Sequence, residues 1–314
     1  MISGAAAVDV AGSAVLAVPA ETSVLPVPGE SGAGGAGVLG TPPGAGVAGS
    51  GPVRGVLFDL DGTIYRGGEL IPGASETIES LKSSGIRCVF ASNNPTATSL
   101  DYARRLTGMG IPTEASEVLT SGGVAAQWLL RTHPDASVFV VGEAPLIREL
   151  ETAGVRVTAS EDADVVLAAF DRTFTYEKWN TAFQALRRGA LFVATNPDTT
   201  CPVADGGLIP DCGGITAALE TTTGRQLDVV IGKPSLIMAA AALERLGMSA
   251  GEALMVGDRP ETDIEMGRAA GIRTVLVLTG VSGPAAAAAG TATAVLPSVR
   301  ELPALLGTWA QPAS

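Results

Sequence analysis

The feature that most constrains this 314-residue chain is a repeated alternation of short apolar segments with helix-like segments, starting near residue 53. The apolar segments 54–60 and 86–94 are continuous rather than alternating, which is typical of strands buried on both faces. Segment 72–85, between them, carries apolar residues at helical spacing and ends at a glycine. This alternation predicts an α/β fold, a Rossmann-like, doubly wound parallel sheet with helices on both faces.

Elements of both kinds continue to about residue 306. Further strands are expected in segments 137–142, 164–170, 190–196, 228–235, 252–263 and 273–280. Further helices are expected in segments 98–110, 178–189, 235–248 and 263–271. Residues 1–51, in contrast, are rich in Ala, Gly, Pro and Val and lack aromatic and basic residues, so we predict that they are disordered. They are either a genuine flexible arm or a stretch upstream of the true start.

The composition excludes several classes of function. A formal net charge of −12 argues against nucleic-acid binding, because phosphate backbones bind basic surfaces. Three cysteines without CxxC spacing make a disulfide scaffold or a thiolate zinc site unexpected, and the only histidine, His133, lies in a Pro-containing turn. No apolar run reaches the roughly 20 residues of a membrane span, and no base precedes Arg54 to form a secretory signal. We therefore expect a cytoplasmic protein without nucleic-acid or membrane partners.

Polar residues gather where four of the expected strands end. These residues are Asp59 with Asp61, Ser92 with Asn93 and Asn94, Lys233, and Asp258 with Asp263. In open α/β sheets, ligands bind outside the carboxyl ends of the strands. If the four strands are neighbours, the four clusters meet in one pocket.

Asp59 and Asp61 are two residues apart, so they point the same way from an extended backbone. Adjacent carboxylates repel each other unless one is protonated or a cation lies between them. Mg²⁺ takes one or two carboxylates together with phosphate and water, and Asp258 would add a third carboxylate. Together with Lys233, these residues have the composition of a magnesium–phosphate site. The alternative is that residues 59–62 form only an Asx-type turn.

The other clusters also have a functional and a structural interpretation. Ser92, Asn93 and Asn94 would donate hydrogen bonds to phosphate oxygens, or would cap the helix that follows. Lys233 would hold a phosphate and a carboxylate, or would be a solvated surface lysine. Asp263 would serve the site, or would be a favourable charge at a helix N-terminus.

The order of these clusters resembles the four motifs of the haloacid dehalogenase-like hydrolase superfamily. The matching motifs are DxDGT at 59–63, Ser92, Lys233 and GDxxxxD at 257–263, and the resemblance covers residues 53–300. The long insertion between Ser92 and Lys233, with the segments SNNPTATS, NPDTTCPVADGGLIPDCGG and VIGKPS, is similar to the NagD-type (class IIA) group. That group includes phosphatases of glycerol 3-phosphate, 2-phosphoglycolate, pyridoxal phosphate and nucleotides.

This resemblance implies a domain organisation. A core of residues 52–122 and 228–306 would be interrupted by an inserted α/β class 2 (IIA) cap of residues 123–227. Residues 307–314 would form a short C-terminal tail. Relatives often dimerise through the cap, so a homodimer of this kind is expected.

The resemblance also implies a role for each motif residue. Asp59 would be the nucleophile that forms an aspartyl-phosphate, and Asp61 would protonate the leaving group and then activate water. Mg²⁺ would be bound by Asp59, the backbone carbonyl of Asp61 and Asp258. The residues expected to bind the phosphate or the substrate are Asp61, Ser92, Asn93, Asn94 and Lys233. Asp263 would act on the site through other residues.

The cap would set the choice of substrate through the loop 196–214, which is expected to cover the pocket. Cys201 falls where the group varies its substrate-facing residue, or is a small buried hydrophobe. Asp211 stands where many relatives carry a small residue, so we expect a shifted specificity. Cys88, within a strand, is expected to belong to the core.

The expected function is Mg²⁺-dependent hydrolysis of a small phosphate ester similar to glycerol 3-phosphate or phosphoglycolate. The presence of Asp61 favours a phosphatase, since a dehalogenase does not need an acid for the leaving group. One alternative is a phosphotransferase or mutase that moves the phosphoryl group to a sugar rather than to water. The other is a protein that binds a phosphometabolite without turnover.

Overall fold

The computed structural model describes residues 51–203, 207–282 and 290–309, and these described residues belong to one compact unit. Apart from Gly51, the segment 1–51 with its predicted disorder lies outside the described residues. Within the described ranges, none of the helices combines the length and the apolar character needed to cross a membrane.

The first sheet has six parallel strands and carries the predicted α/β core. In spatial order the strands are β15 (Ala294–Leu296), β14 (Arg273–Val277), β13 (Ala253–Gly257), β1 (Gly55–Asp59), β4 (Arg87–Ser92) and β5 (Val118–Thr120). The chain proceeds from β1 toward β5 on one side and from β13 toward β15 on the other. The direction therefore switches between β1 and β13, the place where α/β sheets bind ligands.

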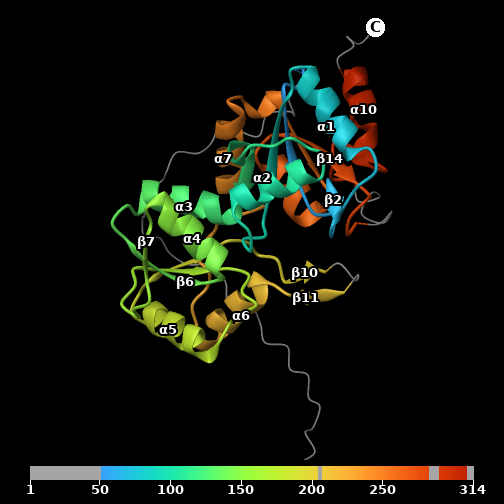
Figure 1. Ribbon diagram of the computed structural model, residues 1–314. Helices are drawn as coiled ribbons and strands as arrows, with labels where there is room; N and C mark the ends of the chain where they lie inside the picture. Colours follow the sequence, from blue (N-terminus) through green and yellow to red (C-terminus); the bar gives the residue numbers. More distant parts are fainter. Residues whose placement is uncertain (1–50, 204–206, 283–289, 310–314) are drawn as a thin grey trace, which may run out of the picture. The chain divides into compact units, whose positions relative to one another are not determined.

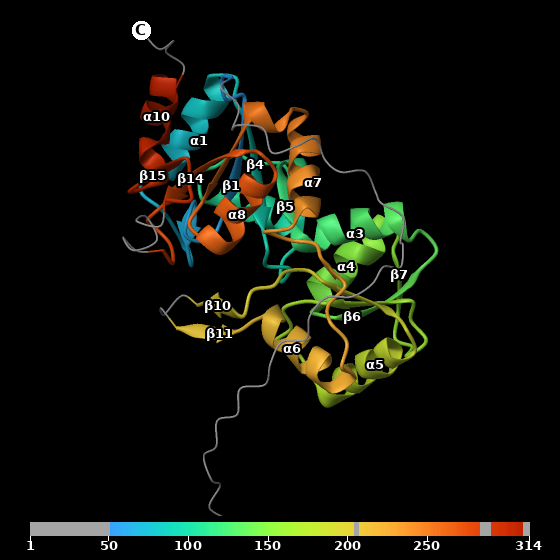
Figure 2. The same cartoon turned by 180° about the vertical axis from the view of Figure 1, so that it is seen from behind.

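Helices cover both faces of this sheet (Figures 1 and 2). Side chains alternate along β1, so Val56 and Phe58 join one buried cluster and Leu57 joins another. The first cluster includes side chains of α1 (Ala74–Ser83), α2 (Ser99–Gly108) and α10 (Leu302–Trp309). The second includes side chains of α7 (Leu236–Leu246) and α8 (Glu265–Ala269). The doubly wound arrangement predicted from the sequence is confirmed.

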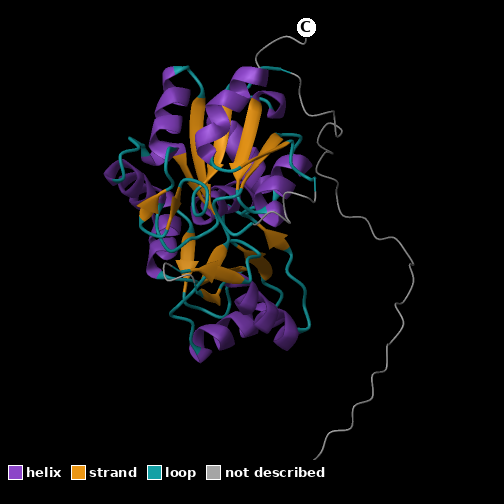
Figure 3. Cartoon of the chain, turned by 90° about the vertical axis from the view of Figure 1, so that its right-hand side faces the viewer, coloured by secondary structure: helices purple, strands orange, loops and turns teal. Residues whose placement is uncertain are grey.

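A second parallel sheet is inserted between β5 and α7 of the chain, and Figure 3 shows the two sheets as separate groups of strands. Its strands are β12 (Val229–Val230), β9 (Leu191–Ala194), β8 (Val165–Ala168), β6 (Ser137–Val141) and β7 (Arg156–Thr158). One face carries α3 (Ser121–Thr132) and α4 (Ala144–Ala153), and the other carries α5 (Tyr176–Arg187) and α6 (Cys212–Thr223) (Figure 1).

Short elements complete the described fold. They are the hairpin of β10 (Thr200–Pro202) and β11 (Leu208–Pro210), the pair β2 (Tyr65–Arg66) and β3 (Glu69–Leu70), the 3-10 turns η1 (Ala115–Glu117), η2 (Ala250–Glu252) and η4 (Val299–Glu301), and the π-helical turn η3 (Pro260–Ile264). The hairpin lies in the loop 196–214 that was expected to cover a pocket; residues 204–206 of that loop are outside the described part.

Two expectations about the elements need correction. Segment 228–235 was expected to be a strand of the core, but β12 pairs with β9 of the second sheet. An apolar run shows that a strand is buried, not which sheet it joins. At the C-terminus, α10 continues to Trp309, so residue 307 lies within a helix rather than at the start of a tail. The domain limits 52–122, 123–227 and 228–306 stay a prediction.

Candidate active site

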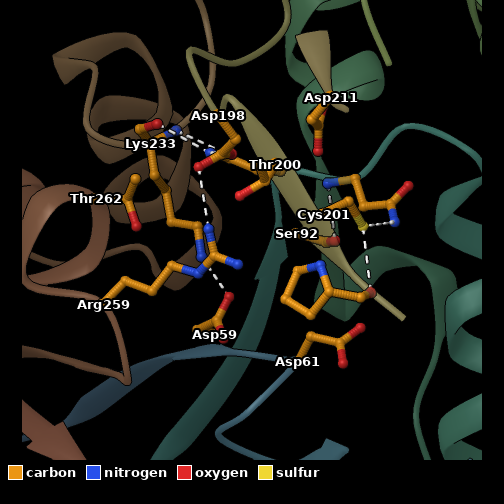
Figure 4. Close-up of a pocket in the computed structure, with 13 residues that line it drawn as sticks. Asp59, Asp61, Ser92, Asp198, Thr200, Cys201, Asp211, Lys233, Arg259 and Thr262 are labelled. Atoms are coloured by element: carbon orange, nitrogen blue, oxygen red, sulfur yellow. Dashed lines mark hydrogen bonds and ion pairs between the residues drawn. The ribbon is translucent and has the colours of Figure 1, made fainter. Parts of the chain in front are cut away.

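Three of the four predicted motif clusters lie at one edge of the first sheet. Asp59 ends β1, Ser92 ends β4, and Asp258 directly follows β13, and these three strands are neighbours. Lys233 reaches the same place from the connection between β12 and α7. One pocket collects most of the predicted residues (Figure 4). It is lined by Asp59, Asp61, Ser92, Asn93, Asn94, Asp198, Thr200, Cys201, Pro202, Asp211, Lys233, Arg259 and Thr262.

An acidic cluster lies at the base of this edge. Carboxylate oxygens of Asp59, Asp258 and Asp263 lie within 4.8 Å of one another, and all three residues are buried. Asp258 Oδ2 accepts a hydrogen bond from the Val281 N–H at 2.7 Å, whereas Asp258 Oδ1 and Asp59 Oδ2 have no hydrogen-bond partner among the described residues. Buried oxygens of this kind normally have a partner. The oxygen-only donor set fits a hard divalent cation such as Mg²⁺.

The turn after β1 packs directly against this cluster. Gly62 has a φ of 93°, and a β-carbon at this position would lie 2.7 Å from Asp258 Oδ2. Only glycine therefore fits here. The hydroxyl of Thr279 also donates to the Gly62 carbonyl at 2.6 Å. Residues 59–62 can therefore form a turn and also belong to the site, because the turn brings the backbone of Gly62 close to the carboxylate of Asp258.

Lys233 is the cation of the cluster. Its side chain is buried, with Nζ paired to Asp59 Oδ1 and lying 2.7 Å from Asp263 Oδ1. Burial acts to lower the pKa of Lys233, but Asp263 and Asp59 outweigh it and raise that pKa above its ordinary value. The surface-lysine interpretation is therefore wrong. Asp263, predicted to act through other residues, contacts Lys233 directly and also accepts a hydrogen bond from the Arg259 N–H at 3.1 Å.

The side-chain amide of Asn93 makes all of its hydrogen bonds within the protein. Its Oδ1 accepts from the Lys233 N–H at 2.8 Å, and its Nδ2 donates to the Lys233 carbonyl and to Asp198 Oδ2, both at 2.9 Å. The amide therefore fixes the chain around Lys233 rather than pointing free into the pocket. The helix-cap interpretation of residues 92–94 is wrong, because Thr98 caps α2.

Asp61 lies in the pocket with an environment suited to holding a proton. Burial, and then the charge of Asp59, raise the pKa of Asp61 above its ordinary value. A carboxyl group with a raised pKa can act as a general acid near neutral pH. The pKa of Asp258 is also raised, by burial and by Asp59 and Asp263. A bound cation would offset this mutual repulsion.

The inserted unit supplies the opposite side of the pocket. Asp198 Oδ1 lies 3.3 Å from Arg259 Nη1. This ion pair joins the insertion to the residue that follows Asp258. Sequence reasoning missed Asp198, Thr200, Pro202, Arg259 and Thr262. Arg259 lies between the two aspartates of the last motif, and Asp198 lies in the segment NPDTT, but spacing alone did not reveal that they meet.

The two predicted specificity residues both line the pocket. Cys201 is half-buried on β10, and burial raises the pKa of its thiol to about 11, so it remains protonated. Asp211 is the N-cap of α6, and its Oδ1 accepts hydrogen bonds from the Cys212 N–H at 2.5 Å and from Asn196 Nδ2 at 3.3 Å. Burial raises the pKa of Asp211. Cys88 is buried in β4, as predicted for a core residue.

A doubly wound sheet with a buried lysine–carboxylate cluster at its switch point, covered by an inserted α/β unit, defines the class of Rossmann-like α/β proteins with an inserted cap. Comparisons with known proteins identify the family. A family model described as haloacid dehalogenase-like hydrolase matches residues 56–156, and a second, HAD-hydrolase-like model matches residues 230–302.

Individual relatives agree with these models. The sugar-phosphatase AraL of Bacillus subtilis is 42% identical over 72% of this chain and 83% of its own. The crystal structure of a 4-nitrophenylphosphatase from Thermotoga maritima has a TM-score of 0.76 and 36% identity, covering 80% of this chain and 96% of that one. NagD from Escherichia coli K-12 has a TM-score of 0.73 and 32% identity, with 80% and 98% coverage.

The chain belongs to the haloacid dehalogenase-like hydrolases, in the NagD-type capped group, and it is a phosphatase. The resemblance drawn from the motifs is confirmed, as is the cap fold of the inserted unit.

Proposed function

We propose that this phosphatase is Mg²⁺-dependent and hydrolyses a small phosphate monoester, similar to glycerol 3-phosphate or phosphoglycolate, through an aspartyl-phosphate. The observation that carries the proposal is the environment of Asp59. One of its oxygens pairs with Lys233, and the other is buried beside Asp258 without a hydrogen-bond partner among the described residues. A carboxylate held in this way is fixed at the carboxyl edge of the sheet, at the pocket and beside an acidic cluster that fits a cation.

In the first step, a carboxylate oxygen of Asp59 attacks phosphorus and the bond between phosphorus and the leaving oxygen breaks. Asp61 gives its proton to that oxygen, so the product is a neutral alcohol. In the second step, water attacks the phosphorus of the aspartyl-phosphate, and Asp61 takes the proton of the water. The bond to Asp59 breaks, inorganic phosphate leaves, and both aspartates return to their starting state.

Four residues are proposed to hold the phosphoryl oxygens: Ser92, Asn93, Asn94 and Lys233. For Asn93 the donor is the backbone N–H, since its side-chain amide already has three partners. Asp59, the backbone carbonyl of Asp61 and Asp258 are proposed to hold Mg²⁺. The cation would neutralise charge on the phosphate and on the buried carboxylates.

The test measures phosphate release from a panel of small phosphate esters, with Mg²⁺ or with EDTA. We expect release from wild type to require Mg²⁺, and Asp59→Asn to lower kcat more than about 1,000-fold, since it removes the nucleophile. Asp162→Asn is the matched control, because Asp162 is 80% exposed on the inserted unit. Undiminished release in EDTA, or by Asp59→Asn, would contradict the proposal. Phosphate found on an added alcohol instead of in water would identify a phosphotransferase.

A further inference from the structure

The charges around the pocket are unevenly distributed between its two sides. Among the described lining residues, the inserted unit contributes Asp198, Thr200, Cys201, Pro202 and Asp211, and none of these is a cation. The two lining cations, Lys233 and Arg259, come from outside this group of residues. The side of the pocket that the insertion forms is therefore polar and acidic. Under the proposed function the phosphoryl group lies against Asp59 and Lys233, so the leaving group extends toward this side.

Both lining cations already have carboxylate partners. Lys233 is paired with Asp59 and, at 2.7 Å, with Asp263, and Arg259 lies 3.3 Å from Asp198. A negative charge on the leaving group would have to compete for these partners. Of the lining carboxylates on the inserted unit, Asp198 is balanced by Arg259, whereas Asp211 has no ion pair among the described residues.

Asp211 also changes how the N-terminus of α6 would act on an anion in the pocket. A helix N-terminus attracts anions through its free N–H groups. At α6 the Asp211 carboxylate accepts from the first of these, the Cys212 N–H, at 2.5 Å. No hydrogen bond from the described residues reaches the second oxygen, Oδ2, and Figure 4 shows the carboxylate pointing into the pocket toward Cys201 and Ser92. The residue is 6% exposed, so solvent screens its charge poorly. Burial acts to raise the pKa of Asp211, whereas the hydrogen bonds from Cys212 and Asn196 act to lower it and favour the charged form.

We infer that Asp211 is a specificity residue that selects phosphate esters of uncharged, hydroxyl-bearing alcohols and excludes esters whose leaving group carries a carboxylate. This inference rests on the proposed function and chooses between its two substrate types. A hydroxyl group can donate a hydrogen bond to Asp211, whereas a carboxylate brought beside it would be repelled in a poorly solvated site. Glycerol 3-phosphate and 2-phosphoglycolate are small esters that differ in this respect.

The experiment compares kcat/KM for glycerol 3-phosphate and 2-phosphoglycolate, with 4-nitrophenyl phosphate to report active enzyme. We expect wild type to prefer glycerol 3-phosphate by at least about tenfold. Asp211→Asn should shift the ratio toward 2-phosphoglycolate by at least about tenfold, mainly through a lower KM for that ester. Asparagine is as good an N-cap as aspartate, so this change removes the charge while keeping the cap. Asp211→Ser, also a good N-cap, is the second variant if the first does not fold.

Asp162→Asn is the matched control, since it makes the same change in net charge at an exposed position, and it should leave the ratio at the wild-type value. A wild type that prefers 2-phosphoglycolate, or an Asp211→Asn ratio equal to that of wild type, would overturn the inference alone. A wild type that hydrolyses none of the three esters would overturn the proposed function instead.

Discussion

Asn93 joins three parts of the chain that are far apart in the sequence. It follows β4, its amide holds the main chain of Lys233 on both sides, and it donates to Asp198 of the inserted unit. Both amide hydrogens and the amide oxygen are engaged in this way. A residue that the sequence suggested as a phosphate ligand is thus, through its side chain, a positioning residue for the lysine of the site.

Replacing Asn93 by aspartate keeps the shape of the side chain but removes both donors and places a like charge beside Asp198. We expect Asn93→Asp to lower kcat/KM by about 100-fold, because small misplacements of catalytic groups cost about this much. Asn180→Asp, on the exposed face of α5, is the matched control. Steady-state kinetics would measure both variants. An Asn93→Asp enzyme within about twofold of wild type would contradict this role.

At this scale the sequence predicts the residues that carry chemistry better than the residues that support them. Asp59, Ser92 and Asp258 were identified because polar residues stand out where apolar strands end. The pair of Arg259 and Asp198 was not, because it depends on how the insertion folds back over the sheet. No spacing in the sequence encodes such a contact.

At the scale of elements, most helices around the first sheet were predicted well, whereas the helices α3, α4 and α6 of the insertion and the shortest strands were not predicted. α1, α2 and α7 fall within their predicted segments, since each has apolar residues at helical spacing and a clear stop. The strands β5, β7 and β15 were not predicted, because a segment of three residues is too short to show a hydrophobic period. The strand β12 was predicted but placed in the wrong sheet.

A capping box lies directly before β13, the strand that precedes Asp258, and its contribution to stability depends on pH. Glu252 Oε2 accepts hydrogen bonds from the Ser249 hydroxyl at 2.7 Å and N–H at 3.1 Å, and Oε1 pairs with Arg54 at 2.8 Å. The Ser249 contacts, and then Arg54, lower the pKa of Glu252 from 4.5 to about 2. Because the folded state favours the ionised form, the stabilisation is complete above about pH 4.5 and is lost as the pH falls toward 2.

We therefore expect Glu252→Gln to lower Tm at pH 7, with a difference from wild type that shrinks steadily below about pH 4.5. Thermal unfolding of both proteins across this range measures the effect. Glu79→Gln, at an exposed position of α1, is the matched control. A difference between Glu252→Gln and wild type that stays constant or grows toward low pH would refute the assignment.

At the scale of the molecule, the site exists because two sheets and their connections bring distant segments together. The first sheet and its helices supply Asp59, Ser92, Asp258 and Asp263. The connection from β12 to α7 supplies Lys233, and the insertion supplies Asp211. The order of motifs along the chain was enough to predict the first group and the family. The insertion lines part of the pocket, and its contacts there are not visible in a motif. The homodimer through the cap and the cytoplasmic location stay predictions.

The central claim, that this edge of the sheet performs phosphoryl transfer to Asp59, is tested most directly by trapping the intermediate. Wild type and Asp61→Asn would be mixed with 4-nitrophenyl phosphate and Mg²⁺, quenched in acid within the first turnover and analysed by peptide mass spectrometry. We predict one added phosphoryl group on the peptide that contains Asp59, in larger amount for Asp61→Asn because water then lacks its base. Nitrophenol release without any such adduct, together with hydrolysis by Asp59→Asn, would contradict the account.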